Sequence, residues 1–137
     1  MAQTIVVIDG MGGGIGVQLI EKLREAGINN EIVALGTNSA ATERMMKAGA
    51  NRGATGENAI KVSVRSADYI LGPIGIVIPN SMLGEITPSM AEAILSADAK
   101  RIIVPLQQSH FFLAGCEYNP INKTIDLAVE AIKQFCH

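Results

Sequence analysis

Short apolar runs alternate along this chain with segments whose apolar residues recur every three or four positions. The first run, Thr4 to Ile8, ends at Asp9 and is followed at once by a cluster of glycines. Apolar runs of this length are typical of buried strands, and the three-to-four spacing is typical of helices with one buried face. The pattern therefore predicts strands and helices in alternation, which indicates a parallel sheet covered by helices on both faces.

The predicted helices have recognisable starts and ends. The first should end at Ala26 because Gly27 follows it, Ser39 is placed to cap the second, and Thr87 followed by proline begins the fourth. The predicted helices cover residues 14–26, 40–48, 57–66, 87–95 and a last segment that starts at 119–120. The inner face of the last helix should hold Ile121, Ile125, Val129, Ile132 and Cys136.

The strands are predicted less clearly than the helices. Four are predicted at residues 4–8, 31–35, 68–71 and 101–106, and the alternation requires another within 50–56. Residues 76–78 either extend the strand before them beyond a bulge or form a separate piece, and residues 111–118 are a candidate extra strand or hairpin. With right-handed crossovers, the predicted fold is α/β: a Rossmann-like three-layer domain over residues 1–137, with an open, mostly parallel sheet of about five strands in order 3-2-1-4-5.

Composition narrows the class of protein. Apolar residues make up 48% of the 137 residues and charged residues 18%, which indicates a globular chain. The net charge is -2 and no basic stripe is present, so we expect no nucleic-acid surface. The first apolar run is too short for a signal peptide or a membrane span. A mean hydropathy of +0.29 indicates a buried self-interface, so we expect a homo-oligomer, in the simplest case a homodimer.

Cysteine and histidine usage predicts neither disulfides nor a metal site. Cys116 and Cys136 lie far apart in a chain that needs no covalent cross-links, which favours a reduced, cytoplasmic setting. The cysteines and the two histidines, His110 and His137, show no paired metal-ligand spacing. His110 is the one internal histidine and so the obvious group that titrates near neutral pH, which makes it a candidate acid or base.

The glycine cluster is the strongest functional signal. Five glycines fall within residues 10–16, directly between the first predicted strand and the first helix. Such a turn lets a ligand approach the backbone closely, and the first amides of the helix then point at an anion. The alternative is a tight turn that binds nothing. The residues expected to bind a nucleotide are Gly10, Met11, Gly12, Gly13, Gly14, Ile15 and Gly16.

The spacing of the glycines excludes two common loops. The strict dinucleotide fingerprint needs a third glycine where this chain has Ile15 or Val17, and a P-loop needs a lysine and a hydroxyl residue where it has Val17 and Gln18. With Gly10, Gly14 and Gly16, the loop instead resembles the Gly-x-x-x-Gly-Ile-Gly loop of the short-chain dehydrogenases. In that family the loop wraps the adenosine and pyrophosphate of a nicotinamide cofactor, so the resemblance implies NADP or NAD as the ligand.

The dehydrogenase resemblance covers only about the first 25 residues, one βα unit. The family's catalytic Tyr-x-x-x-Lys is missing, since the fourth position after Tyr69 is Pro73 and that after Tyr118 is Asn122. Hydride transfer by that family's mechanism is therefore not expected. Over its whole length, on residues 7–16, 53–59 and 72–77, the chain resembles a family of short bacterial proteins of unknown function. That resemblance implies a Rossmann-like domain and no known activity.

Three further segments could complete the site. Asp9 could accept hydrogen bonds from the loop's own amides, or hold a ribose hydroxyl or a metal-bound water. The second strand is followed by Thr37, Asn38 and Ser39, with no acid to grip an adenosine ribose. These groups could accept a 2′-phosphate with Arg44 nearby, which slightly favours NADP over NAD, or they could simply form a cap and turn.

The third segment follows the fourth strand. Gly72, Pro73 and Ile74 should face the glycine loop across the crevice where the strand order reverses, or else form a bulge that redirects the chain. Three functions stay open: a nucleotide-binding protein, a small enzyme that acts on a phosphorylated or carboxylated metabolite with His110 as acid or base, and an interaction protein without a ligand. The sequence does not decide whether the protein is an enzyme.

Overall fold

The computed structural model describes residues 2–106 and 112–136, and its centre is a five-stranded sheet. The strands are β1 (Ile5–Asp9), β2 (Ile32–Gly36), β3 (Arg52–Thr55), β4 (Tyr69–Pro73) and β5 (Lys100–Val104). They lie side by side in the order β3-β2-β1-β4-β5, and every pairing is parallel. The α/β class and the predicted strand order are therefore confirmed.

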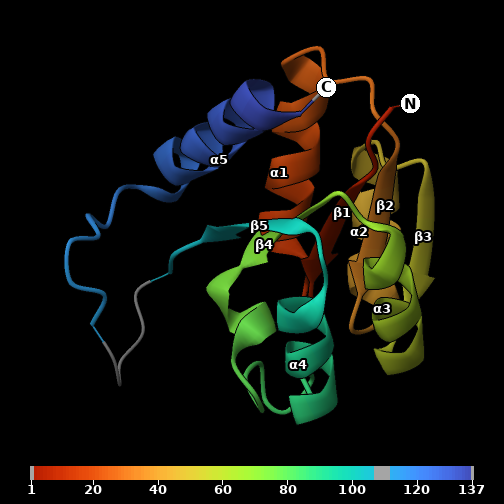
Figure 1. The fold of residues 1–137 in the computed structure, drawn as a ribbon. Coiled ribbons are helices and arrows are strands. Elements are labelled where there is room, and N and C mark those ends of the chain that lie inside the picture. The colour runs from red at the N-terminus through yellow and green to blue at the C-terminus, as the bar shows by residue number, and fades with distance from the viewer. Residues whose placement is uncertain (1, 107–111, 137) are drawn as a thin grey trace.

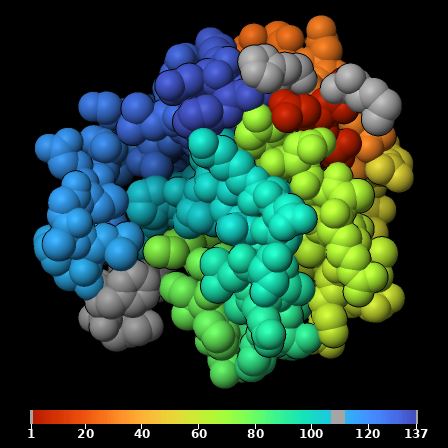
Figure 2. Space-filling view, in the orientation of Figure 1, coloured from red at the N-terminus to blue at the C-terminus, as the bar shows by residue number. Residues whose placement is uncertain are grey.

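Helices cover both faces of this sheet (Figure 1). They are α1 (Gly14–Glu25), α2 (Ser39–Ala48), α3 (Glu57–Ser63), α4 (Pro88–Ser96) and α5 (Ile121–Phe135), with short 3-10 turns η1 (Val64–Ser66) and η2 (Ile74–Val77). α1 packs between α2 and α5 on one face, while α3 and α4 pack together on the other. Figure 2 shows the α3 and α4 face, with the residues just before α5 at the left in blue.

The alternation of side chains along β1 divides the core in two. Ile5 and Val7 pack into the apolar cluster beneath α1, α2 and α5, whereas Val6 and Ile8 pack into the cluster beneath α3 and α4. All five residues of β1 are buried. A strand buried on both faces must lie at the centre of the sheet, so its carboxyl end brings the glycine cluster to the middle of one sheet edge.

Three local expectations need correction. The cap of α2 is Asn38, whose side chain accepts a hydrogen bond from the Ala41 amide, so Ser39 is already the first helical residue. Residues 76–78 neither extend β4 nor form a strand, because the chain turns into η2 directly after Pro73. The candidate strand at residues 111–118 is not formed within 112–118, which have no regular structure. The cap of α4 is confirmed, since the Thr87 hydroxyl accepts from the Met90 amide.

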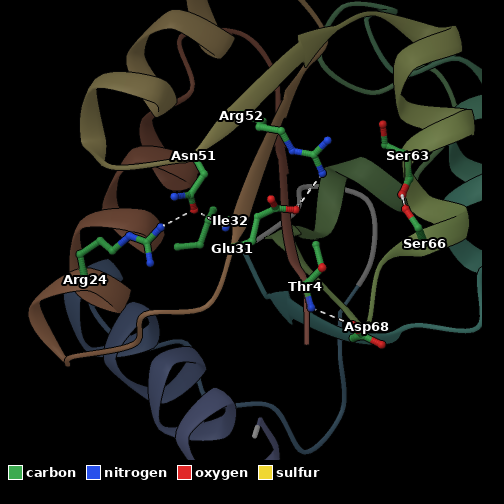
Figure 3. Close-up of polar contacts among 9 residues, drawn as sticks. All are labelled: Thr4, Arg24, Glu31, Ile32, Asn51, Arg52, Ser63, Ser66 and Asp68. Atoms are coloured by element: carbon green, nitrogen blue, oxygen red, sulfur yellow. Dashed lines mark hydrogen bonds and ion pairs between the residues drawn. The ribbon is translucent and has the colours of Figure 1, made fainter. Parts of the chain in front are cut away.

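Polar contacts fix the opposite, amino-terminal ends of the strands (Figure 3). Arg24 of α1 donates to the side chain of Asn51, which also accepts from the Ile32 amide, so one side chain joins α1, β2 and the start of β3. The Thr4 amide donates to Asp68 just before β4. Because these contacts fix the strands relative to one another at one edge, the loops at the other edge extend from a rigid frame.

Candidate functional site

The glycine loop, residues 10–16, turns sharply between β1 and α1. Met11 and Gly13 both have left-handed backbones, with φ of 51° and 73°. The Gly13 amide donates to the Gly10 carbonyl at 2.8 Å, and Gly13 caps α1 without a side chain of its own. The carboxyl end of β2 lies alongside, because the Thr37 amide donates to the Asp9 carbonyl at 3.0 Å.

Asp9 caps α1 in place of a side chain from the cap residue. Its two carboxylate oxygens accept from the amides of Gly10 and Gly16, each at 2.8 Å. The side chain is buried, and desolvation raises its pKa above the ordinary value despite the opposing effect of these amides. The expectation that Asp9 accepts hydrogen bonds from the loop itself is confirmed. Its oxygens are thereby engaged within the protein.

The loop's glycines divide into two kinds by what surrounds them. A methyl group on Gly16 would lie 2.5 Å from the Met45 sulfur, and one on Gly10 would lie 2.5 Å from the Thr37 hydroxyl, so side chains of the protein itself fill the space beside both glycines. A methyl group on Gly14 would meet nothing within 4 Å, and one on Gly12 would meet only the Arg44 guanidinium. The open positions of the loop are therefore Gly12 and Gly14, whereas a methyl group on Gly13 between them would lie 3.1 Å from the Ala41 backbone.

These open positions carry free backbone donors and a cation. The amides of Gly12 and Gly14 make no hydrogen bond to any described residue. Arg44, exposed on α2, donates one guanidinium N–H to the Gly12 carbonyl. Its other N–H groups have no hydrogen-bond partner in the described part of the chain, and its charge also acts on the Asp9 carboxylate. Free amides at a helix start beside an arginine are a suitable environment for a phosphate group.

A cavity of about 410 Å³ opens over the loop. Its walls come from the glycine loop, from Pro73 and Gly75 after β4, from Ser81 and Met82, and from Leu106 after β5. The segment after β4 thus faces the glycine loop across the crevice between β1 and β4, as the sequence predicted. A cavity at the point where strand order reverses is where α/β sheets hold ligands.

Two of the three residues predicted to bind the nucleotide at the end of β4 do not line the cavity. Gly72 is buried within β4, and a methyl group there would collide with the Ile8 carbonyl oxygen, so this glycine lets β4 approach β1. Ile74 begins η2 and does not line the cavity. Pro73, which does line it, is the one predicted residue of the three that reaches the open space.

The groups at the end of β2 surround the carboxylate of Glu85, which was not predicted to lie there. Glu85 accepts hydrogen bonds from the Met11 amide at 2.8 Å, from the Asn38 side chain at 3.0 Å and from the Thr37 hydroxyl. The Thr37 hydroxyl, first, and the Met11 amide hold the pKa of Glu85 below its ordinary value. Glu85 thus occupies the place where we expected a 2′-phosphate. Ser39, the other residue expected there, is taken up by the first turn of α2.

A loop of unusual backbone geometry delivers Glu85 to this place. Residues 80–86 close on themselves, since the Asn80 amide donates to the Ile86 carbonyl at 2.7 Å and the Ile86 amide to the Ser81 carbonyl. Three non-glycine residues, Asn80, Met82 and Leu83, have φ between 56° and 65°. Left-handed non-glycine residues are uncommon and cluster at functional sites. In Figure 1 this green segment lies at the lower edge of the sheet, where the strands end.

Other parts of the chain offer less chemistry. A hollow of about 520 Å³ lies between β3 and α3 at the amino ends of the strands, lined in part by Thr4, Arg52 and Ser63 (Figure 3). It lies across the sheet from the glycine loop. The described residues include no cluster of metal-binding side chains and no helix long and apolar enough to cross a membrane. His110, the candidate acid or base, lies outside the described residues.

Comparisons with known proteins find one matching family model and solved structures of low sequence identity. A family model described as a domain of unknown function (DUF3842) matches residues 4–137. No curated protein matches the chain. A solved universal stress protein in complex with cAMP is similar at 18% identity and a TM-score of 0.43, over 76% of this chain and 97% of that one. A dodecameric FMN-dependent Ubix-like decarboxylase from Escherichia coli O157:H7 is similar at 17% identity and a TM-score of 0.47, over 96% and 76%.

Proposed function

The chain belongs to the DUF3842 family, a domain of unknown function. From the geometry of the site, we propose that it binds a nucleotide whose phosphates contact the glycine loop. The ligand class we propose is a dinucleotide, NADP or NAD. Its phosphates would lie on Gly12 to Gly14, with one end toward β2 and the other in the cavity between β1 and β4.

One observation carries this proposal: the amides of Gly12 and Gly14 have no hydrogen-bond partner among the described residues, and the loop is open at Gly14 and has Arg44 at Gly12. A turn that served only the fold would be filled from within, as it is at Gly10 and Gly16. The helix dipole and the arginine both favour an anion at this point. The buried Asp9 opposes it, but its charge is partly offset by the amides that it accepts from.

A thermal-shift series tests the proposal. We expect NAD or NADP to raise the melting temperature, because a ligand at a hundredfold its dissociation constant adds about 2.7 kcal/mol to the free energy of unfolding. FAD, ATP and sugar phosphates serve as comparison ligands. A rise with sugar phosphates alone would favour the small-metabolite enzyme, and no rise with any nucleotide would reject the proposal.

We also infer that two copies associate along β5 and α5. β5 is an outer strand of the sheet, and a hollow of about 590 Å³ beside it is lined by residues of β5, of α5 and of the segment 115–119 between them, among them Ile102, Val104 and Leu127. Leu127 is 53% exposed and Phe112 is 77% exposed. An edge strand that pairs only with β4 among the described strands, beside an exposed leucine, favours a second copy, because excluding water from this apolar surface would be favourable.

Replacing Leu127 with lysine should separate the copies. We expect Leu127→Lys to sediment as a monomer where the unchanged protein sediments as a dimer, and to lose the dependence of its melting temperature on protein concentration. The matched control is Leu95→Lys on α4, since Leu95 has the same 53% exposure on the opposite face. A dimer that survives Leu127→Lys, or dissociates equally with Leu95→Lys, would place the interface elsewhere.

A further inference from the structure

We propose that Glu85 receives the adenosine ribose of the nucleotide and selects a ribose without a 2′-phosphate. This inference rests on the proposed nucleotide function and chooses NAD over NADP within it. Rossmann-type sites that take NAD carry an acid at the end of the second strand, which hydrogen-bonds the ribose hydroxyls. No such acid follows β2 in the sequence, but the fold brings Glu85 to the same place from 48 residues beyond Thr37.

The two oxygens of Glu85 differ in their partners. All three donors, from Met11, Thr37 and Asn38, reach Oε1. Oε2 has no donor among the described residues, although an ionised carboxylate offers acceptor sites on both oxygens. The three donors orient Glu85 through one oxygen and leave the other available, which suits a pair of ribose hydroxyl donors.

The position of Glu85 relative to the phosphate cradle fits this role. Its anchor, the Met11 amide, is one residue before Gly12, the first open position of the loop. Asn38 joins the same groups, because it donates both to Glu85 and to the Met11 carbonyl at 2.8 Å. A nucleotide with phosphates on Gly12 to Gly14 would therefore have its ribose close to the Glu85 carboxylate. The left-handed residues of the 80–86 loop indicate that this placement is held against local backbone preference.

The charge of Glu85 decides the sign of the selectivity. A 2′-phosphate would bring a second anion against a carboxylate that already has its donors, whereas ribose hydroxyls would supply the donors that Oε2 lacks. Arg44 is the one cation identified beside the loop, and its contact is with the Gly12 carbonyl. If Arg44 governed selectivity, NADP would be preferred. Glu85 and Arg44 therefore predict opposite selectivities between NAD and NADP, and binding measurements can distinguish the two.

Calorimetric titration of the full chain with NAD⁺ and NADP⁺ tests the inference. We expect the unchanged protein to bind NAD⁺ at least about tenfold more tightly, and Glu85→Gln to bring the two affinities within about threefold by weakening NAD⁺. The glutamine keeps an oxygen for the anchoring donors, so the loops should stay in place. Glu92→Gln, at an exposed position of α4, is the matched control and should leave the ratio unchanged. ATP and 2′-deoxy-ATP repeat the test for a mononucleotide ligand.

The outcomes distinguish this inference from the proposed function. Equal binding of NAD⁺ and NADP⁺ that Glu85→Gln does not alter would overturn the role of Glu85 and leave the nucleotide site intact. A preference for NADP⁺ that Arg44→Gln removes would assign selectivity to Arg44 instead. A Glu85→Gln variant that binds both ligands more tightly would show that Glu85 obstructs the site. Failure of every nucleotide to bind would reject the proposed function together with this inference.

Discussion

The Gly14→Val variant is expected to bind NAD and NADP at least about a hundredfold more weakly than the unchanged protein while folding normally. A side chain at this position would project into the space where the phosphate should lie, and no protein atom lies within 4 Å to be displaced by its first carbon. Gly14 is the first residue of α1 and has no positive φ, so valine can adopt its backbone conformation. Thermal shift with each ligand and melting without ligand give the two measurements.

The matched control is Glu21→Val, which places the same side chain at an exposed position of the same helix. Valine costs a helix roughly half a kcal/mol relative to the best formers, so both variants should melt within a few degrees of the unchanged protein. The decisive result is loss of the ligand shift in Gly14→Val alone. If Gly14→Val folds and still binds with unchanged affinity, the phosphates lie elsewhere and the glycine loop is only a turn.

The fold was largely predictable because the buried strands are continuous apolar runs and the helices have clear caps. A run such as Ile5 to Ile8 fits only a strand buried on both faces, and Thr87 with proline fits only a helix start. The prediction failed where local patterns are ambiguous. Residues 76–78 were expected to extend the strand before them or to form a separate piece, but the chain turns into η2, which packs against α4.

The candidate site was predictable only in its local part. The glycine loop and the segment after β4 are contiguous in sequence, and parallel topology brings them together. Glu85 was not predictable, because its loop uses left-handed backbone at Met82 and Leu83, where side chains disfavour it. The one available signal was negative: no acid follows β2.

Replacing Asp9 with alanine should lower the free energy of unfolding by about 2–3 kcal/mol, although it removes a buried charge. The carboxylate satisfies the amides of Gly10 and Gly16, and without it these buried donors have no acceptor. Loss of a cap at a helix start costs about 1 kcal/mol, and each buried donor left unsatisfied costs about 1–3 kcal/mol. Relief of desolvation recovers part of that sum. Urea unfolding measures the difference, with Asp126→Ala on the exposed face of α5 as the control.

The pH dependence of the difference in unfolding free energy between the unchanged protein and Asp9→Ala separates the hydrogen-bonding contribution of Asp9 from its desolvation cost. Burial raises the pKa of Asp9 above its ordinary value of 3.8. Between pH 3.8 and the raised pKa, the native protein therefore binds more protons than the unfolded chain. Stability from this group is therefore full below pH 3.8 and declines as pH rises through the raised pKa. The gap between the unchanged protein and Asp9→Ala should narrow over that range, while Asp126→Ala shows no such trend. If Asp9→Ala were the more stable protein at neutral pH, the carboxylate would be a net cost to folding, and its place beneath the glycine loop would then need a reason in ligand binding.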